Sequence, residues 1–323
     1  MGDYITHQDM MGIPAWEMSD FSKLAANPVV SVILTTYNHE KYAAQAIEGV
    51  IMQQCDFPIE LLIGEDCSTD RTLEVCREYQ RRYPQIIRLI TSEANVGAHQ
   101  NYFRQHARTR GRYLALCDGD DYWTQPLKLQ KQVEFLEANP EHTLCFHNAH
   151  IVYEEGRAKP HLFNLKGLST VTVREIIEWD WIIPTASIVV PRAAITMLPA
   201  TFYSFPSGDL PLSILCASAG KVHYFDECMS VYRKQQGGVH YALISDLERG
   251  LKHVEGENSM LESLDRTLEG KYRQSFRKRI QQNRRRIDYL RLRRGRQFSP
   301  RLIWNSIHYL YYRSCWKWRA TKW

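Results

Sequence analysis

The chain has 323 residues, of which 44% are hydrophobic and 24% charged, so it can bury an ordinary globular core and is not a mainly disordered protein. Its length allows one large α/β domain with an appendage. The net charge of +5 conceals an asymmetry, because residues 271–323 hold 17 Lys or Arg and one acid, Asp288, whereas the remainder carries −11. A tail this basic is expected to bind an anionic surface.

The chain shows no sign of a secretory signal or a membrane span. Its first 20 residues lack a basic region followed by an apolar stretch, and no window reaches about 18 uninterrupted apolar residues. The eight cysteines form no CxxC pair and several lie in apolar runs, which favours buried, reduced thiols. We therefore expect a cytoplasmic protein.

Alternating strand and helix patterns begin at Pro28. Strands are expected over residues 29–35, 59–64, 86–90 and 112–117. Helical patterns separate them over residues 43–51, 68–79, 97–108 and from Pro126 onward, and Ser68 is a candidate N-cap for the second of these helices. Strands separated by single helices predict an α/β fold with a mostly parallel central sheet.

After about residue 143 the alternation becomes irregular. Further strands are expected over residues 144–153, 186–190, 222–225 and 229–232, and from about Asp246 the pattern is helical. The predicted organisation is an N-terminal extension over 1–27, an α/β domain over 28–240, and a basic helical C-terminal extension over 241–323.

Polar clusters follow three of the predicted strands. They are Thr35-Thr36-Tyr37-Asn38, Glu65-Asp66-Cys67-Ser68-Thr69-Asp70 and Asp118-Gly119-Asp120-Asp121. Parallel sheets bind ligands beyond the carboxyl ends of their strands, so these clusters are expected to form one site. The glycine-rich GxGxxG turn of dinucleotide-binding folds is absent, which argues against a dehydrogenase.

The third cluster predicts a metal site. Asp118 and Asp120 stand two residues apart around Gly119, which permits a tight bend. Mg²⁺ and Mn²⁺ prefer oxygen ligands and commonly bridge protein carboxylates to substrate phosphates, so such an ion would neutralise the charge on a leaving diphosphate. The competing interpretation is a solvated acidic turn at the start of the next helix.

The other two clusters suit a nucleotide. Tyr37 offers a flat face for a base, Thr35 offers a hydroxyl nearby, and Glu65 and Asp66 can accept hydrogen bonds from a base edge or a ribose. Asp66, Ser68 and Asp70 can equally be turn and cap residues, a role that we assign to Ser68 and Asp70.

A glycine turn follows the third strand. In Asn95-Val96-Gly97, the glycine permits close backbone approach to a ligand or an unusual torsion at a helix start. For Asn95, an ordinary strand-to-helix turn is an equal alternative.

Together these elements resemble glycosyltransferase family 2, whose members have the GT-A fold, a Rossmann-like α/β domain. The matching segments are Val-Ser-Val-Ile-Leu-Thr-Thr-Tyr-Asn (30–38), Ile-Gly-Glu-Asp-Cys-Ser-Thr-Asp (63–70), Asn-Val-Gly (95–97), Leu-Cys-Asp-Gly-Asp-Asp-Tyr-Trp (116–123), Pro-Leu-Lys-Leu (126–129), Phe-His-Asn (146–148), Ser-Gly-Asp-Leu-Pro-Leu (207–212) and Tyr-Arg-Lys-Gln-Gln-Gly-Gly (232–238). They occur in the family's order over about residues 28–240, which makes the resemblance specific.

The resemblance implies inverting transfer of a sugar from a nucleotide-diphospho-sugar. It implies that Asp120 binds a divalent cation, Mn²⁺ or Mg²⁺, and that Asp118 is shared between the ion and the ribose. It also implies that Asp209 is the general base, which removes the proton of the attacking acceptor hydroxyl. From the residues alone, Asp209 could also cap a helix beginning near Pro211. The implied contacts to the nucleotide-sugar are Thr35, Tyr37, Glu65, Asp66, Asn95, Gly97, Asp118 and Arg233.

One position departs from the family pattern. Gln235 stands where relatives often carry a histidine near the metal or diphosphate, and Gln235 is a poor ligand for the ion. His240 is a remote substitute, so the third metal ligand is open. Arg233 and Lys234 remain candidates to contact the diphosphate. His147 suits either an acceptor pocket or an ordinary buried position.

The tail mixes Trp and Tyr with Arg and Lys over residues 271–323, a composition that suits the headgroup layer of an anionic membrane. Alternatives are a helix packed on the domain with a solvated basic face and, more remotely, a nucleic-acid tail; we expect no nucleic acid. A membrane location fits a lipid-linked glycan as acceptor and the cytoplasmic face of the inner membrane as location.

Two other functions compete with glycosyl transfer. A nucleotidyltransferase would need a basic phosphate-binding loop, which the segment 35–38 lacks. A catalytically silent membrane scaffold is opposed by the presence of Asp118, Asp120 and Asp209. The donor nucleotide is expected to be UDP, the commonest in the family, and the acceptor a glycan or lipid-linked glycan.

Overall fold

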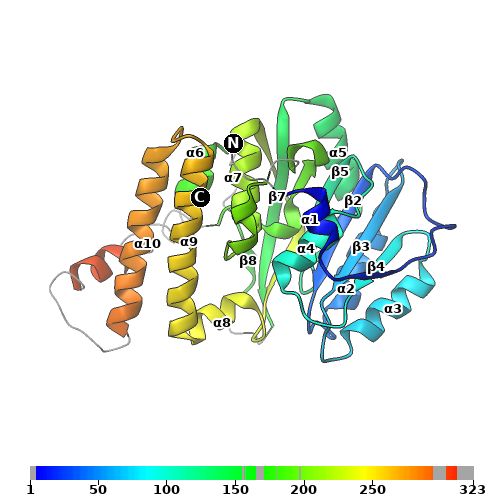
Figure 1. Ribbon diagram of the computed structural model, residues 1–323, viewed down its shortest axis with the longest axis horizontal. Coiled ribbons are helices and arrows are strands. Elements are labelled where there is room, and N and C mark those ends of the chain that lie inside the picture. The colour runs from blue at the N-terminus through cyan, green and yellow to red at the C-terminus, as the bar shows by residue number, and fades with distance from the viewer. Residues whose placement is uncertain are drawn as a thin grey trace.

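A ten-stranded sheet with helices on both faces forms the body of the molecule (Figure 1). The computed structural model describes residues 5–154, 156, 158–164, 171–179, 181–195, 198–293 and 303–310. The strands neighbour one another in the order β1 (Trp16–Met18), β4 (Ile87–Thr91), β3 (Ile59–Glu65), β2 (Val30–Thr36), β5 (Tyr113–Asp118), β9 (Val189–Pro191), β7 (His142–Tyr153), β10 (Lys221–Lys234) and β6 (Tyr122–Trp123), with β8 (His161–Leu162) paired to β7.

The sheet is mixed, so the prediction of a mostly parallel sheet is wrong. Strands β4, β3, β2 and β5 pair in parallel, as do β7 and β10, but β1, β6, β8 and β9 all join antiparallel. Each of these four strands has only two or three residues. Of these four strands, only β9 overlaps a predicted strand, the one over residues 186–190, and tertiary partners fix the direction of all four.

The alternation of side chains along β2 explains why the sheet is covered on both faces. Val30, Val32 and Leu34 pack into the core beneath α2 (Ala43–Ile51), α3 (Thr72–Arg82) and α5 (Lys128–Ala138). Ile33 points to the opposite face and joins the core beneath α4 (Ala98–His106), α6 (Val173–Glu178) and α7 (Asp209–Ala219). Each such fully buried side chain contributes about 1.5–3 kcal/mol. This two-sided burial holds the strand ends at one rigid edge.

The first four predicted strands are confirmed to within one residue. The predicted strands over 222–225 and 229–232 are instead one strand, β10, with register shifts between Phe225 and Ser230 that bend it without ending it. The predicted cap at Ser68 is wrong. Helix α3 begins at Thr72, whose N–H donates to Asp70 Oδ1 at 2.9 Å, and the Ser68 hydroxyl is used by another loop.

The C-terminal extension is helical, as predicted. It comprises α8 (Val239–Ser245), α9 (Leu247–Thr267) and α10 (Arg273–Arg293), and Figure 1 shows α9 and α10 side by side at the end of the molecule away from β2, β3 and β4. The Asp246 carboxylate caps α9 by accepting the N–H groups of residues 248 and 249. Phe276 on α10 enters the main core, and Arg279 forms a buried ion pair with Glu257 at 2.7 Å.

The remaining elements are short. They are α1 (His7–Met11) and the 3-10 turns Thr185–Ser187, Arg192–Ile195 and Ala200–Ser204. Residues 303–310 form a further helix, and the rest of the basic tail, 294–302 and 311–323, lies outside the described residues. Among the helices that the structure describes, none combines the length and the apolarity that crossing a bilayer requires. Six of the described cysteines, Cys55, Cys67, Cys76, Cys117, Cys145 and Cys216, form no disulfide bond.

Candidate active site

The three polar clusters meet at one edge of the sheet. In the parallel register Thr35 lies beside Asp118 and Thr36 beside Glu65, so the loops after β2, β3 and β5 begin at the same level. The first two loops are tied together, because the Asn38 N–H donates to Ser68 Oγ at 3.0 Å and Asn38 Oδ1 accepts the N–H of residue 69 at 2.8 Å. The predicted convergence of the clusters is therefore observed.

The acidic turn is anchored through its backbone. The Gly119 N–H donates to the Thr35 carbonyl oxygen at 2.8 Å, and the Asp121 N–H donates to the Asp118 carbonyl oxygen at 3.0 Å. A Cβ added to Gly119 would stand 2.5 Å from Thr36 Oγ1 and 2.8 Å from His39 Nδ1. Gly119 is thus required because the turn lies directly on β2.

The three acids of this turn have different surroundings. Asp121 is buried and its Oδ1 accepts the Arg233 N–H at 2.8 Å, which ties the turn to β10. Asp120 is partly exposed, and its Oδ2 accepts Nε2 of Gln235 at 3.3 Å and lies 3.9 Å from Nε2 of His39. Within the described part of the chain, no group donates a hydrogen bond to the Asp118 carboxylate.

Asp118 is electrostatically uncompensated. Burial, followed by the charges of Asp120 and Asp209, raises the pKa of Asp118 to about 8. A cation between Asp118 and Asp120 would remove this penalty. No group of three or more His, Cys, Asp or Glu side chains gathers as a metal site among the described residues. A site of two carboxylates fits an ion such as Mg²⁺, which is commonly held by one or two carboxylates together with substrate phosphates.

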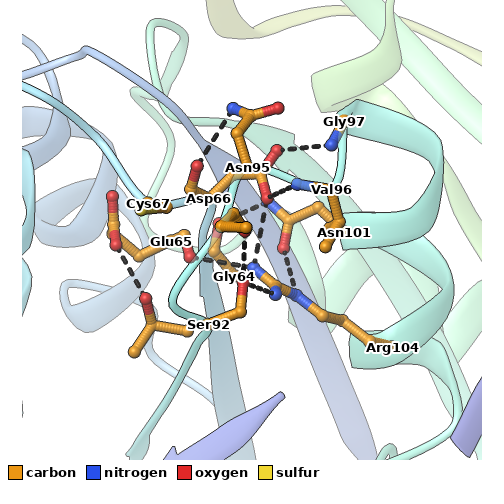
Figure 2. A network of polar contacts seen from close by, with 12 residues as sticks. Gly64, Glu65, Asp66, Cys67, Ser92, Asn95, Val96, Gly97, Asn101 and Arg104 are labelled. Atoms are coloured by element: carbon orange, nitrogen blue, oxygen red, sulfur yellow. Dashed lines mark hydrogen bonds and ion pairs between the residues drawn. The ribbon is translucent and has the colours of Figure 1, made fainter. Parts of the chain in front are cut away.

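Glu65 and Asp66 are buried and fully engaged with protein (Figure 2). Glu65 accepts the N–H of residue 68 at 2.7 Å and the Thr91 hydroxyl at 2.9 Å. Asp66 accepts the N–H groups of Val96 and Gly97, both at 2.9 Å. The two carboxylates therefore hold the loops after β3 and β4 in place, and their oxygens do not face an open space.

Arg104 on α4 is the residue of this network that the sequence did not indicate. Its guanidinium is buried and donates to the carbonyl oxygens of Glu65 (2.8 Å) and Pro14 (3.1 Å), to the Ser92 hydroxyl (2.5 Å) and to Asp66 Oδ1 (3.4 Å). Figure 2 shows it approaching the end of β3 from below the loop. Its helical neighbours Gln100, Asn101 and Arg108 are polar, so no hydrophobic pattern marked Arg104 as buried.

The remaining nucleotide candidates surround this network. Tyr37 is 42% exposed at the end of β2, and Thr35 Oγ1 accepts Nε2 of Gln105 at 3.3 Å. Asn95 Nδ2 donates to the Asp66 carbonyl oxygen at 3.0 Å, which gives this amide a role within the turn. Gly97 has a φ of +88°, a conformation that a residue with a Cβ rarely adopts.

Asp209 is the first residue of α7 and is not its N-cap, which is Gly208. Its Oδ2 accepts the indole N–H of Trp181 at 3.0 Å and the Thr185 hydroxyl at 2.8 Å, and its Oδ1 accepts the N–H of Leu210 at 2.8 Å. Burial raises the pKa of Asp209, and these hydrogen bonds oppose the shift. The carboxylate is thereby oriented and made a stronger base than an exposed aspartate.

Asp209 and the acidic turn both act electrostatically on Tyr232. Burial raises the pKa of Tyr232, and the charges of Asp121, Asp120, Asp118 and Asp209 add to the shift in that order. Asp209 likewise acts on Asp118. The acidic groups from β5 and α7 are therefore close enough to interact electrostatically, although more than 80 residues separate them in the chain.

The side chain of Arg233 lies near the acidic turn, because its charge acts on Asp121 and on His39. Its guanidinium forms an ion pair with Glu154 at 3.0 Å, donates to Gln45 Oε1 at 2.7 Å, and lies over the rings of Tyr42 and Tyr122 at 4.6 and 5.0 Å. Its described contacts with the acidic turn run through its backbone N–H.

His147 is fully buried, and its Nδ1 donates to the carbonyl oxygen of Asn148 at 2.7 Å, so it occupies an ordinary core position. The side chain of His240 lies outside the description.

Comparison with known proteins places this site in a family. The family model "Glycosyl transferase family 2" matches residues 31–195. An uncharacterized protein of Mycobacterium tuberculosis is 35% identical over 221 residues, which cover 67% of this chain and 62% of the relative, so the match spans less than two thirds of that protein.

Solved structures agree on the fold. Staphylococcus aureus TarS 1-349 in complex with UDP-GlcNAc superimposes with a TM-score of 0.53 at 17% identity, covering 84% of this chain and 93% of TarS. The mannosyltransferase PcManGT from Pyrobaculum calidifontis, in complex with GDP-Man and Mn²⁺, gives 0.52 at 17% identity and covers 77% and 68%. The chain belongs to glycosyltransferase family 2 and has the GT-A fold.

Proposed function

We propose that the protein transfers a sugar from a UDP-sugar to a hydroxyl of a glycan or lipid-linked glycan, with inversion at the anomeric carbon. One observation carries the proposal: the oriented Asp209 carboxylate lies close enough to the acidic turn for its charge to act on Asp118. A base on one side and a diphosphate site on the other are what a single displacement requires.

The donor would lie along the carboxyl ends of β2, β3 and β5. Tyr37, with its exposed ring, would stack on the base, with Thr35 beside it. Glu65 and Asp66 would shape the base pocket through the loops that they hold, together with Asn95 and Gly97. The choice of UDP follows the family prior and the TarS complex with UDP-GlcNAc, whereas PcManGT binds GDP-Man.

The transfer would proceed in one step. The acceptor hydroxyl oxygen attacks the anomeric carbon as its proton passes to Asp209, and the bond from that carbon to the diphosphate oxygen breaks on the opposite face. Asp118 and Asp120 would hold a divalent cation, which supplies charge neutralisation for the nucleoside diphosphate as it leaves. PcManGT, which was solved with Mn²⁺, supports this assignment. Arg233, whose backbone N–H holds Asp121 and whose Nη1 is buried without a hydrogen-bond partner among the described residues, would contact the diphosphate.

Two other functions make different predictions. A nucleotidyltransferase would release pyrophosphate from a nucleoside triphosphate, and a silent scaffold would release nothing. The test is nucleotide release by the purified protein with Mn²⁺ or Mg²⁺ and a panel of UDP-, GDP- and dTDP-sugars. Wild type is expected to release the nucleoside diphosphate, and Asp209→Asn and Asp120→Asn each to lose at least 100-fold in rate. Intact turnover in both variants would overturn the site.

We also propose that residues 271–323 bind an anionic membrane, which would place the enzyme at the cytoplasmic face of the inner membrane. In this proposal the chain consists of an N-terminal extension (1–27), the catalytic domain (28–240) and the C-terminal extension (241–323). On α10, Arg277 and Arg284 are exposed, stand two helical turns apart on one side, and have no ion-pair partner among the described residues.

The helix over residues 303–310, which contacts α10 at Asp288 and Tyr289, adds exposed apolar side chains to this region. Ile303, Trp304 and Ile307 are 44%, 63% and 56% exposed. The opposite side of the helix is docked on α10, because Asn305 Nδ2 donates to Asp288 Oδ2 at 2.6 Å. Exposed apolar side chains next to arginines suit an interfacial helix.

Vesicles test this membrane contact. Phe276 of α10 belongs to the main core, so point variants are better probes than a truncation. The double variant Trp304→Ser/Ile307→Ser is expected to cosediment at least fivefold less with phosphatidylglycerol vesicles, whereas Trp16→Ser, at a residue 43% exposed on β1, is expected to bind as wild type. Equal binding by all three proteins would overturn the membrane proposal.

A further inference from the structure

Trp181 is the exposed aromatic residue nearest to the proposed base. Its indole N–H donates to Asp209 Oδ2 at 3.0 Å, yet 42% of the residue is exposed. One edge of the ring is thus fixed at the carboxylate while much of the ring remains open to solvent. A tryptophan that served only to fill the core would bury its ring, which offers a large apolar surface.

The backbone of Trp181 is strained. Its φ is +50°, in the left-handed region that bulky residues rarely adopt. Such strain is concentrated at functional sites and persists only where the surroundings enforce it. The described contact that holds Trp181 in this conformation is the hydrogen bond to Asp209, so the strained turn and the base carboxylate are coupled.

The geometry limits what can lie against the ring. Asp209 Oδ2 accepts hydrogen bonds from the side chains of Trp181 and Thr185, whereas no described side chain donates to Oδ1, which accepts the N–H of Leu210. Oδ1 therefore retains the capacity to receive the acceptor proton. A hydroxyl within about 3 Å of Oδ1 brings the rest of its molecule against the indole, because the two oxygens belong to one carboxyl group.

We propose that the exposed indole face of Trp181 is the stacking platform for the acceptor, and that the acceptor group bound there is a pyranose ring. This inference rests on the proposed function. A pyranose presents a face of C–H groups that matches a flat aromatic surface, while its rim of hydroxyls stays available to the base. Trp181 would serve as a specificity-determining residue through its ring and as a positioning residue through its N–H.

The two roles separate in two variants. Trp181→Phe keeps an aromatic face and removes the hydrogen bond to Asp209, whereas Trp181→Ala removes both. Trp16→Ala is the matched control, because Trp16 is 43% exposed and lies on β1 at the far edge of the sheet. Trp181→Leu, which keeps an apolar side chain without an aromatic face, replaces Trp181→Ala if the latter fails to fold.

The assay uses the nucleotide-sugar that the donor panel identifies and the octyl glycosides of glucose, galactose, mannose and N-acetylglucosamine as acceptor probes. Trp181→Ala is expected to raise the KM for the octyl glycoside at least tenfold, with the KM for the donor within threefold of wild type. Trp181→Phe is expected to keep the glycoside KM within threefold and to move the acid side of the pH profile to higher pH. An unchanged glycoside KM in Trp181→Ala overturns the proposal.

A second readout does not require turnover. In protein labelled with 5-fluorotryptophan and saturated with UDP, the ¹⁹F resonance that disappears in Trp181→Phe is expected to shift on addition of an octyl glycoside, while that of Trp16 stays in place. No shift with any of the four glycosides overturns the platform.

Failure of the proposed function gives a different pattern. In that case wild type releases no nucleotide from any donor, or Asp209→Asn is fully active. If wild type is active, Asp209→Asn is inactive and the Trp181 variants match wild type in both readouts, the platform alone is wrong.

Discussion

Replacement of Arg104 by methionine tests whether the network behind the nucleotide loops is structural. Arg104→Met keeps an unbranched apolar stem in α4 but removes the donors to the Glu65 and Pro14 carbonyl oxygens, to Ser92 and to Asp66. Removing one partner of a buried charged pair costs about 3–5 kcal/mol, because the groups left behind stay desolvated. Asp66 keeps two backbone donors, so we expect about 4 kcal/mol rather than the upper limit.

That loss should appear as a lower melting temperature. At about 2 °C per kcal/mol for a chain of this size, Arg104→Met is expected to melt about 8 °C below wild type. Arg104→Lys restores a charge but not the planar fork that reaches several acceptors at once, and is expected to recover less than half of the loss. The control is Arg71→Met, which removes an exposed ion pair to Glu74 and should shift the melting temperature by less than 1 °C.

The consequence for binding follows from the position of the network. Because Asp66 and Arg104 fix the turn at Val96 and Gly97, Arg104→Met is also expected to weaken UDP binding about tenfold in calorimetry. A melting temperature within 2 °C of wild type, together with unchanged UDP affinity, would refute the reasoning. A stable variant with weak UDP binding would contradict the stability estimate alone.

Three further results are expected. Gly119→Ala should lower kcat at least tenfold with little change in circular dichroism, because its Cβ would collide with Thr36 and displace the acidic turn; activity within twofold would contradict this. Thr185→Val removes a donor that lowers the pKa of Asp209, so the rise of kcat/KM with pH should move to higher pH, and an unmoved profile would argue against Asp209 as the base. Burial raises the pKa of Asp118 to about 8, so the folded state is favoured while Asp118 is protonated, and this stability is lost as pH rises through that value. In EDTA at pH 8, Asp118→Asn should therefore have a higher melting temperature than wild type. Added Mn²⁺ should raise the melting temperature of wild type only.

The sequence by itself determined the strands that position the site. In β2, β3, β4 and β5 nearly every residue is buried on one face or the other, so continuous apolar runs revealed them to within one residue. The polar clusters at the ends of these strands could be recognised for the same reason, because the residues become polar where the strand leaves the core. Parallel register then required Thr35, Glu65 and Asp118 to meet at one edge.

Tertiary structure decided what the local pattern could not encode. The antiparallel direction of β9, which overlaps the strand predicted over residues 186–190, depends on neighbours far away in the chain, and so does the continuity of β10 through its bulges. The partners of buried polar groups were equally hidden: the sequence suggested that Glu65 and Asp66 reach toward a ligand, whereas both hold loops.

The same distinction applies to the base. The family resemblance around Asp209 implied a general base. The hydrogen bonds that orient its carboxylate come from Trp181 and Thr185, in a segment more than 20 residues upstream. Hydrophobic periodicity is a property of neighbouring residues and can be read from them. A hydrogen bond between distant segments depends on how the whole chain packs, and only the folded structure decides it.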